Sequence, residues 1–272
     1  MMRHLPPTLC LALALAVAAG SAVRGQGIGL PTQGRNLPLE IHADQGIEWQ
    51  QDRQTYIARG NAVAVQGEVS VHADTLTAWY RKAEGGRTEI YRIDADGSVR
   101  IVSPQQTAYG ARAVYNVTDG ILVLTGKPRM VTATDRITAR DSLEFWEKKS
   151  FAVARGNAVA IREDKRLRAD VLTARFEKGR DGKTRLDRVE AFDNVVISSP
   201  TEIVRGKRGV YDIDTGIAVL RGSVKITRGA DQLNGDAAEV NMNTGVSRLM
   251  GDAGGRVRGS FRPQRKPVPG AR

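Results

Sequence analysis

The sequence predicts an all-β protein whose body is an elongated stack of short strands. Three observations predict it: a long internal repeat, apolar residues that alternate with polar ones along the repeat, and a composition with 29 glycines but only 5% aromatic residues. Many glycines and few large side chains suit short strands joined by tight turns better than a helical bundle. The body contains no run of 18 apolar residues, so we expect no membrane-spanning helix in it.

Residues 1–26 have the plan of a secretory signal peptide. Arg3 precedes an apolar stretch, Leu9–Ala19, which is followed by the small residues Gly20–Ala22. The apolar stretch is short for a bilayer span, so an uncleaved anchor is the weaker alternative. Cys10 is the one cysteine of the chain, so cleavage leaves an exported protein without disulfides.

The body, residues 27–255, is built from a duplication. The segments Ala58–Tyr80 and Ala154–Phe176 both open with Ala-Arg-Gly-Asn-Ala-Val-Ala and lie 96 residues apart. The offset holds without a gap between residues 41–131 and 137–227, with about a third of the positions identical. A partial unit continues to residue 255. We call these two stretches the first and the second repeat.

Each repeat contains smaller units that open with a small residue, in most cases followed by Asp. The openings are 30, 37 and 29 residues apart in each repeat. A unit continues with about six alternating residues, a turn, a second strand, a turn containing Gly, Asn or Asp and, in most units, a third short strand. We expect about 14 or more short strands, with turns at Asp119-Gly120, Thr215-Gly216 and 243–245. The expected third strands are Asn61–Val65, Ser98–Ile101, Asn157–Ile161, Asn194–Ile197 and Ser223–Ile226.

The strand assignment rests on period-two alternation, which is clear in Ile137–Phe145 and in Arg208–Ile213. The units are too short to be the four-stranded blades of a propeller. What remains is two facing sheets of stacked short strands, with apolar side chains between them. Such a stack has two open ends with unpaired backbone groups.

The last 17 residues, 256–272, form a basic tail. They hold six Lys and Arg and no acidic residue, in a chain whose formal net charge is +11. A basic tail rich in Pro and Gly is typically disordered and can contact anionic surfaces, but a solvated tail without a special role is an equal alternative. Because export is expected, we expect no nucleic acid partner.

Three stretches of the first repeat carry a family signature. An opening apolar-polar-apolar-small-Asp strand lies in Leu37–Trp49, a Gly-Asn-Val strand in Gly60–Tyr80, and a Tyr-containing strand with a terminal Leu-x-Gly in Ala113–Val131. In this order they resemble the LptA/OstA-like family of periplasmic lipopolysaccharide-transport proteins. One departure is Ala62, which interrupts the Gly-Asn-Val order.

The resemblance implies a β-jellyroll, a V-shaped trough of antiparallel strands. It implies a periplasmic protein that carries lipopolysaccharide between an inner-membrane extraction complex and an outer-membrane translocon, and that assembles end to end into oligomers. The body is longer than a single-domain member, and the basic tail lies outside the family pattern. The bridge protein itself and a close relative in the same pathway therefore both stay open.

Lipopolysaccharide combines acyl chains with phosphorylated sugars, so its carrier needs an apolar slot and cationic groups near the mouth. Small residues at inward positions leave room for such a slot, or they pack a tight core. By resemblance, and by the internal repeat for the last two, the expected lining residues are Leu39, Ile41, Tyr115, Val117, Tyr211 and Ile213.

Signals for catalysis are weak. The sequence contains no Gly-x-Ser-x-Gly nucleophile motif and no phosphate loop, so we predict neither an enzyme nor a cofactor. His42 and His72 each precede Ala-Asp, and a metal site with Asp44 and Asp74 is conceivable. Repeats place equivalent residues in register for packing reasons, however, so we predict no metal. The alternative to a carrier is a structural or adhesive β-solenoid without a ligand.

Overall fold

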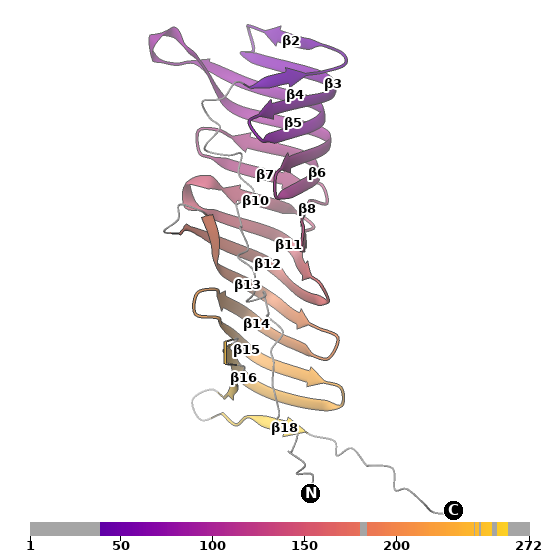
Figure 1. The fold of residues 1–272 in the computed structure, drawn as a ribbon, viewed down its shortest axis with the longest axis vertical. Coiled ribbons are helices and arrows are strands. Elements are labelled where there is room, and N and C mark those ends of the chain that lie inside the picture. The colour runs from indigo at the N-terminus through magenta and orange to yellow at the C-terminus, as the bar shows by residue number, and fades with distance from the viewer. Residues whose placement is uncertain (1–38, 180–183, 242, 245, 252–254, 261–272) are drawn as a thin grey trace, which may run out of the picture.

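The protein is a single antiparallel sheet that is stacked along one long axis. The computed structural model describes residues 39–179, 184–241, 243–244, 246–251 and 255–260. These residues form one 18-stranded sheet, which runs from the N-terminal end to the C-terminal end of the stack (Figure 1). The prediction of an all-β stack is confirmed. The elements are β1 (Glu40–His42), β2 (Ile47–Gln50), β3 (Thr55–Gln66), β4 (Val69–Lys82), the 3-10 helix η2 (Glu84–Gly86), β5 (Thr88–Ser103), β6 (Gln106–Asn116), β7 (Ile121–Thr125), β8 (Arg129–Thr132), β9 (Asp135–Thr138), β10 (Ser142–Trp146), the 3-10 helix η3 (Glu147–Lys149), β11 (Phe151–Arg162), β12 (Lys165–Lys178), β13 (Thr184–Ser198), β14 (Ile203–Asp212), β15 (Ile217–Arg228), β16 (Asp231–Asn241), β17 (Val246–Met250) and β18 (Arg258–Ser260).

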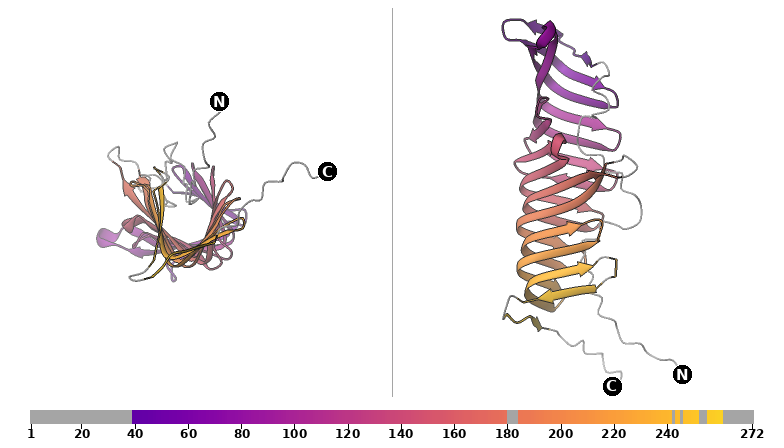
Figure 2. Two further views of the ribbon diagram at one scale, coloured as in Figure 1. Left: turned by 90° about the horizontal axis from the view of Figure 1, so that it is seen from below. Right: turned by 90° about the vertical axis from the view of Figure 1, so that its left-hand side faces the viewer.

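Seen along the long axis, the sheet folds into an open U with two walls (Figure 2). The short strands show how the walls are made, because β3 pairs with β2 through its first half and with β1 through its second half. In the same way β6 pairs with β7 and β8, β11 with β10 and β9, and β16 with β17 and β18. We call the wall of β2, β7, β10 and β17 the tyrosine wall and the wall of β1, β8, β9 and β18 the arginine wall. Each long strand crosses from one wall to the other.

The long strands bend at a two-residue bulge where the walls meet. In β3 the register with β4 shifts between Arg59 and Ala62, and the residues between them, Gly60 and Asn61, both have positive φ. Successive left-handed residues bend a strand without ending it. The expectation of separate third strands was therefore wrong, because the Gly-Asn pairs are corners and not turns. The other corners of this kind are Gly97-Ser98, Gly156-Asn157, Asp193-Asn194 and Gly222-Ser223.

The small-Asp pairs that open the sequence units lie beside these corners. A Cβ on Gly97 would overlap the carboxylate of Asp74, so only glycine lets the neighbouring strand lie so close. At another corner Asn61 donates its side-chain N–H to Asp44 over 2.7 Å. The carboxylates of the unit openings therefore pack over the bends.

One predicted strand is interrupted. The stretch Ile137–Phe145 forms β9 and β10 with a break at 139–141, because the chain passes there from the arginine wall to the tyrosine wall. The break follows the corner of β11: the N–H of Arg140 donates to the carbonyl of Gly156 over 2.7 Å. The first repeat opens with the same break, where the N–H of Asp44 donates to the carbonyl of Gly60.

Inward residues on neighbouring strands are register partners of one another, so their side chains form continuous columns along the stack. The tyrosine wall carries a column of Ala, Leu and one Gly that passes through both repeats, with Leu124 2% exposed and Leu220 fully buried. This column fills the base of the U. Its members are Ala58, Leu76, Ala95, Ala113, Leu124, Leu143, Ala154, Leu172, Ala191, Gly209, Leu220, Ala238 and Leu249.

The turns at Asp119-Gly120 and Thr215-Gly216 join β6 to β7 and β14 to β15, as the sequence predicts. The signal peptide, 1–26, and residues 261–272 of the basic tail lie outside the described residues. Within the part of the chain that the structure describes, no helix has the length and apolar character needed to cross a membrane.

Candidate functional site

An apolar cavity of about 280 Å³ lies between the two walls within the first repeat. The tyrosine wall contributes side chains from β4 to β7, and the arginine wall faces them with side chains from β3, β4 and β5 and with Leu39. Gln66 and the hydroxyl of Tyr115 are the polar groups among the lining side chains. The lining residues are Leu39, Ala64, Gln66, Val69, Val71, Leu76, Ile90, Ile93, Ala95, Ile101, Ala113, Tyr115, Val117 and Leu122.

Three of the six residues expected from the sequence line this cavity. Leu39 comes from the arginine wall, and Tyr115 and Val117 come from the tyrosine wall, so the fold brings the three together. Ile41 lies beside them, half-buried, and pairs with the cavity residue Ala64.

Tyr211 and Ile213 occupy the equivalent positions of the second repeat, away from this cavity. Tyr211 is 5% exposed and Ile213 is half-buried. Burial raises the pKa of the Tyr211 phenol above its ordinary value, and the positive charge of Arg162 opposes part of that shift. The tyrosine of the second repeat therefore lies within electrostatic range of a cation.

The phenol of Tyr115 is anchored at the rim. Its hydroxyl donates to the carboxylate of Glu147 over 3.1 Å, while the residue as a whole is 8% exposed. The polar end of the side chain is thereby satisfied outside the apolar space, and the ring serves as apolar lining.

Aromatic side chains gather at the N-terminal end of the tyrosine wall. The ring of Tyr56 lies between Trp49 and Tyr80, with centroids 5.9 Å and 4.9 Å away. The indole N–H of Trp49 donates to the hydroxyl of Tyr80 over 2.8 Å. Trp49 is nevertheless 56% exposed, because it lies on the terminal strand.

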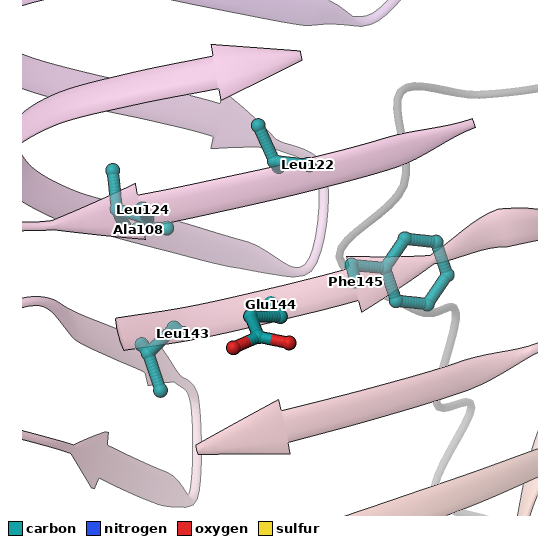
Figure 3. Close-up of a pocket in the computed structure, with 6 residues that line it drawn as sticks. All are labelled: Ala108, Leu122, Leu124, Leu143, Glu144 and Phe145. Carbon is teal, nitrogen blue, oxygen red and sulfur yellow. The ribbon is translucent and has the colours of Figure 1, made fainter. Parts of the chain in front are cut away.

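The inner face continues across the junction of the repeats. A void of only about 10 Å³ lies there between β7 and β10 (Figure 3). Leu122 pairs with Phe145 and Leu124 with Leu143, so apolar side chains face each other across the two strands. A void of this size is too small for a ligand. Packing therefore joins the first repeat to the second without a gap in the apolar surface.

The second repeat holds an ion pair on the inner face, which the sequence analysis missed. The Arg162 guanidinium donates to both oxygens of Asp135, over 2.6 and 2.7 Å, and the two side chains are 16% and 21% exposed. Thr134 donates a further hydrogen bond to Asp135. Burial raises the pKa of the Asp135 carboxyl, but the hydrogen bonds from Arg162 and Thr134 outweigh burial and hold this pKa below its ordinary value.

A second ion pair lies two hairpins further along the arginine wall. Arg228 donates to Glu202 over 2.9 Å, and the Glu202 side chain is 2% exposed. Arg162 and Arg228 follow the inward residues Ala160 and Ile226 by two positions. Strand alternation could therefore have placed both arginines inside.

Other polar groups lie away from the cavity. His72 contacts the hydroxyl of Ser70 at 3.1 Å, and its pKa is lowered first by burial and then by the charge of Arg100. The carboxylates of Glu177, Asp187 and Asp214 lie within 4.8 Å of one another on the second repeat, with Glu177 and Asp214 exposed.

Comparison with known proteins assigns the chain to a family. The model described as "LptA/(LptD N-terminal domain) LPS transport protein" matches twice, over residues 40–141 and 136–246. The chain belongs to this family. It therefore has a role in lipopolysaccharide transport, and its family is one of transport proteins and not of enzymes.

Two individual proteins are similar to parts of the chain. An uncharacterised protein of Rhizobium meliloti (strain 1021) is 29% identical over 127 residues, which are 43% of this chain and 68% of that protein. The crystal structure of LptH from Pseudomonas aeruginosa, described as the LptA homologous periplasmic component of the lipopolysaccharide transport device, is 18% identical with a TM-score of 0.39. The match covers 45% of this chain and 85% of LptH.

Proposed function

We propose that this protein is a periplasmic carrier that shelters the acyl chains of lipopolysaccharide between its two walls. The observation that carries the proposal is the apolar cavity of about 280 Å³ in the first repeat. Transfer of each CH₂ group from water into such a space contributes about 0.8 kcal/mol. In the proposed site Leu39, Tyr115 and Val117 line the cavity and Ile41 lies beside it. Tyr211 and Ile213 are proposed to extend the apolar lining into the second repeat.

The proposed carrier bridges the inner and outer membranes. Among the described residues, the terminal strands pair on one side only: β1 and β2 with β3 at one end, β17 and β18 with β16 at the other. Unpaired strand edges are templates for further pairing. Large apolar side chains are exposed at both ends, with Trp49 at 56% and Val246 at 52%. These edges support end-to-end pairing with a second copy, and with the inner-membrane extraction complex and the outer-membrane translocon.

The proposed route to the periplasm is export by the signal peptide of residues 1–26, which is then cleaved. A carrier of this kind needs no catalytic group, metal or cofactor of its own, since sheltering a lipid breaks no bond. The energy for transport is then supplied by a partner. Nothing in the proposal calls for nucleic acid.

Site-specific photo-crosslinking tests the carrier directly. A photoreactive residue replaces Val117, which lines the cavity, and in a control it replaces Arg100, which is exposed on the outer face of the arginine wall. Illumination with lipopolysaccharide is expected to give an adduct at position 117 and none at position 100. Absence of an adduct at positions 115, 117 and 211 would instead favour a structural β-solenoid without a ligand.

A further inference from the structure

The inner rim of the arginine wall changes its chemistry between the repeats. In the first repeat the rim consists of Leu39, Gln66 and Val69, all of which line the cavity. The residues 96 positions later are Asp135, Arg162 and Lys165. They lie side by side, because Arg162 pairs with Asp135 of β9 and with Lys165 of β12. The same place in the fold is therefore uncharged in one repeat and charged in the other.

This charged rim faces the space between the walls. Arg162 follows Ala160, which packs against the core, by two positions, as Gln66 follows the cavity residue Ala64. Alternate residues of a strand lie on the same face. The charge of Arg162 also acts on Tyr211, which belongs to the opposite wall. The guanidinium therefore lies on the inner side of the arginine wall, where it is held by Asp135 and acts on Tyr211.

Two of the three rim residues are cations, and the one rim carboxylate, Asp135, is paired with Arg162. Asp135 accepts from Nε and Nη2 of Arg162, whereas a guanidinium has five N–H donors. Lys165 adds a second cation on the neighbouring strand. Glu163 and Asp164 of the adjoining turn are exposed, and the charge of Glu163 also acts on Arg162. Arginine and lysine side by side are a common arrangement for binding phosphate.

The distance to the cavity suits one amphiphile. Tyr115 lies on β6, and the pairings from β6 to β8, β9 and β11 lead to Arg162. Three strand spacings of about 4.8 Å place the rim about 14 Å from the cavity along the same groove. A lipid with its acyl chains in the first repeat can therefore extend its headgroup to the rim of the second.

We propose that Arg162 and Lys165 bind a phosphate group of the lipid whose acyl chains occupy the first-repeat cavity. The inference rests on the proposed carrier function and assigns a different role in lipid binding to each repeat. The first repeat holds the apolar part of the lipid, and the second repeat recognises its anionic headgroup. Asp135 holds the guanidinium on the inner face of the arginine wall when no lipid is bound.

The test compares lipids that differ only in phosphate. Binding to the purified full chain is measured by displacement of a fluorescent fatty acid, with phosphorylated lipid A, with its dephosphorylated form and with inorganic phosphate alone. The variants are Lys165→Gln and the double variant Asp135→Asn with Arg162→Gln, which removes both charges of the ion pair together. Arg168→Gln is the matched control, because Arg168 is exposed on the outer face of the same strand β12.

Both test variants are expected to weaken binding of phosphorylated lipid A about tenfold and to leave the dephosphorylated lipid within about twofold of the wild type. Arg168→Gln should change neither, and inorganic phosphate should not displace the fatty acid. Equal weakening for both lipids, or no weakening for either, would overturn the inference. The inference would also be overturned if inorganic phosphate displaced the fatty acid at the same concentration as the phosphorylated lipid, because the site would then bind free phosphate.

Failure of the carrier proposal itself has a different signature, because the wild-type protein would then bind neither lipid. Should the double variant fail to fold, which its melting curve reports, Lys165→Gln alone decides the result, since Lys165 is only half-buried.

Discussion

The two repeats share a frame and differ in what they present to the groove. Leu124 and Leu220 occupy equivalent places in the same buried column, and Tyr115 and Tyr211 do so on the same wall. At the rim, by contrast, Leu39 of the first repeat corresponds to Asp135 of the second. The difference teaches that the residues that bend and pack this sheet are separable from those that select a ligand.

The largest expected effect concerns the shared frame. Leu124→Ala and Leu220→Ala should each lower the free energy of unfolding by about 3 kcal/mol, since each leaves a cavity in a column that excludes water. Stacked repeats contact mainly their neighbours, so each substitution should loosen its own repeat first. Denaturant unfolding measures the loss, and amide hydrogen exchange locates it. Equal loss of protection in both repeats would show that the stack unfolds as one unit.

The second-largest expected difference between the repeats concerns a charged position on the outer face. Asp94 is 2% exposed and accepts hydrogen bonds from Arg92 and Arg112, whereas the equivalent Glu190 is 25% exposed and accepts one from Arg208. Asp94→Asn should cost about 2 kcal/mol, because arginines are left beside a neutral buried group. Glu190→Gln should cost less than about 1 kcal/mol. Urea midpoints compare them, and equal costs would contradict the assigned difference in burial.

Blocking the cavity tests which repeat holds acyl chains. Ala64 lines the cavity, and Ala160 is its half-buried equivalent in the second repeat. Ala64→Phe should weaken fatty-acid binding about tenfold, or about 1.4 kcal/mol, by filling the space. Ala160→Phe, the matched control, should weaken it less. A larger effect of Ala160→Phe would place the acyl chains in the second repeat.

The smallest effect is a pH dependence confined to the second repeat. Burial raises the pKa of the Asp135 carboxyl and Arg162 lowers it, with a net pKa below the ordinary value. A carboxyl whose pKa is lowered in the folded state stabilises the protein above its unfolded-state pKa of about 3.9. This stabilisation is lost as the pH falls from that value through the folded-state pKa. Between pH 6 and pH 3 the wild type should lose about 1 kcal/mol more than Asp135→Asn. Acid titrations of the free energy of unfolding measure the loss, and equal losses in the wild type and in Asp135→Asn would refute the lowered pKa of Asp135.

Much of the fold could be predicted from the sequence. The 96-residue offset and the period-two alternation predict a duplicated stack of strands, and the turn at Asp119-Gly120 was placed correctly. The corners could not be predicted, because Gly60-Asn61 has the composition of a tight turn. Only the pairing of both flanks of β3 with β4 shows that the chain bends and does not reverse.

The candidate site could be predicted in part. The resemblance predicts Leu39, Tyr115 and Val117 in a lipid groove, and the structure has these three side chains around the first-repeat cavity. That they contact lipid stays a prediction. The ion pair of Arg162 and Asp135 could not be predicted, because it depends on the pairing of β9 with β11. That pairing is set by the break in the chain before β10. Register between strands comes from tertiary packing, and alternation within one strand does not reveal it.

The most direct test of the central claim is methyl NMR with a lipid that carries a nitroxide on its acyl chain. Ile93, Ile101 and Val117 line the cavity, whereas Val240 lies on β16 near the C-terminal end of the stack, many strand spacings away. The nitroxide is expected to broaden the methyl signals of the three cavity residues and to spare those of Val240, because broadening falls steeply with distance. Equal broadening at Val240, or none at the cavity residues, would contradict an acyl-chain site between the walls of the first repeat.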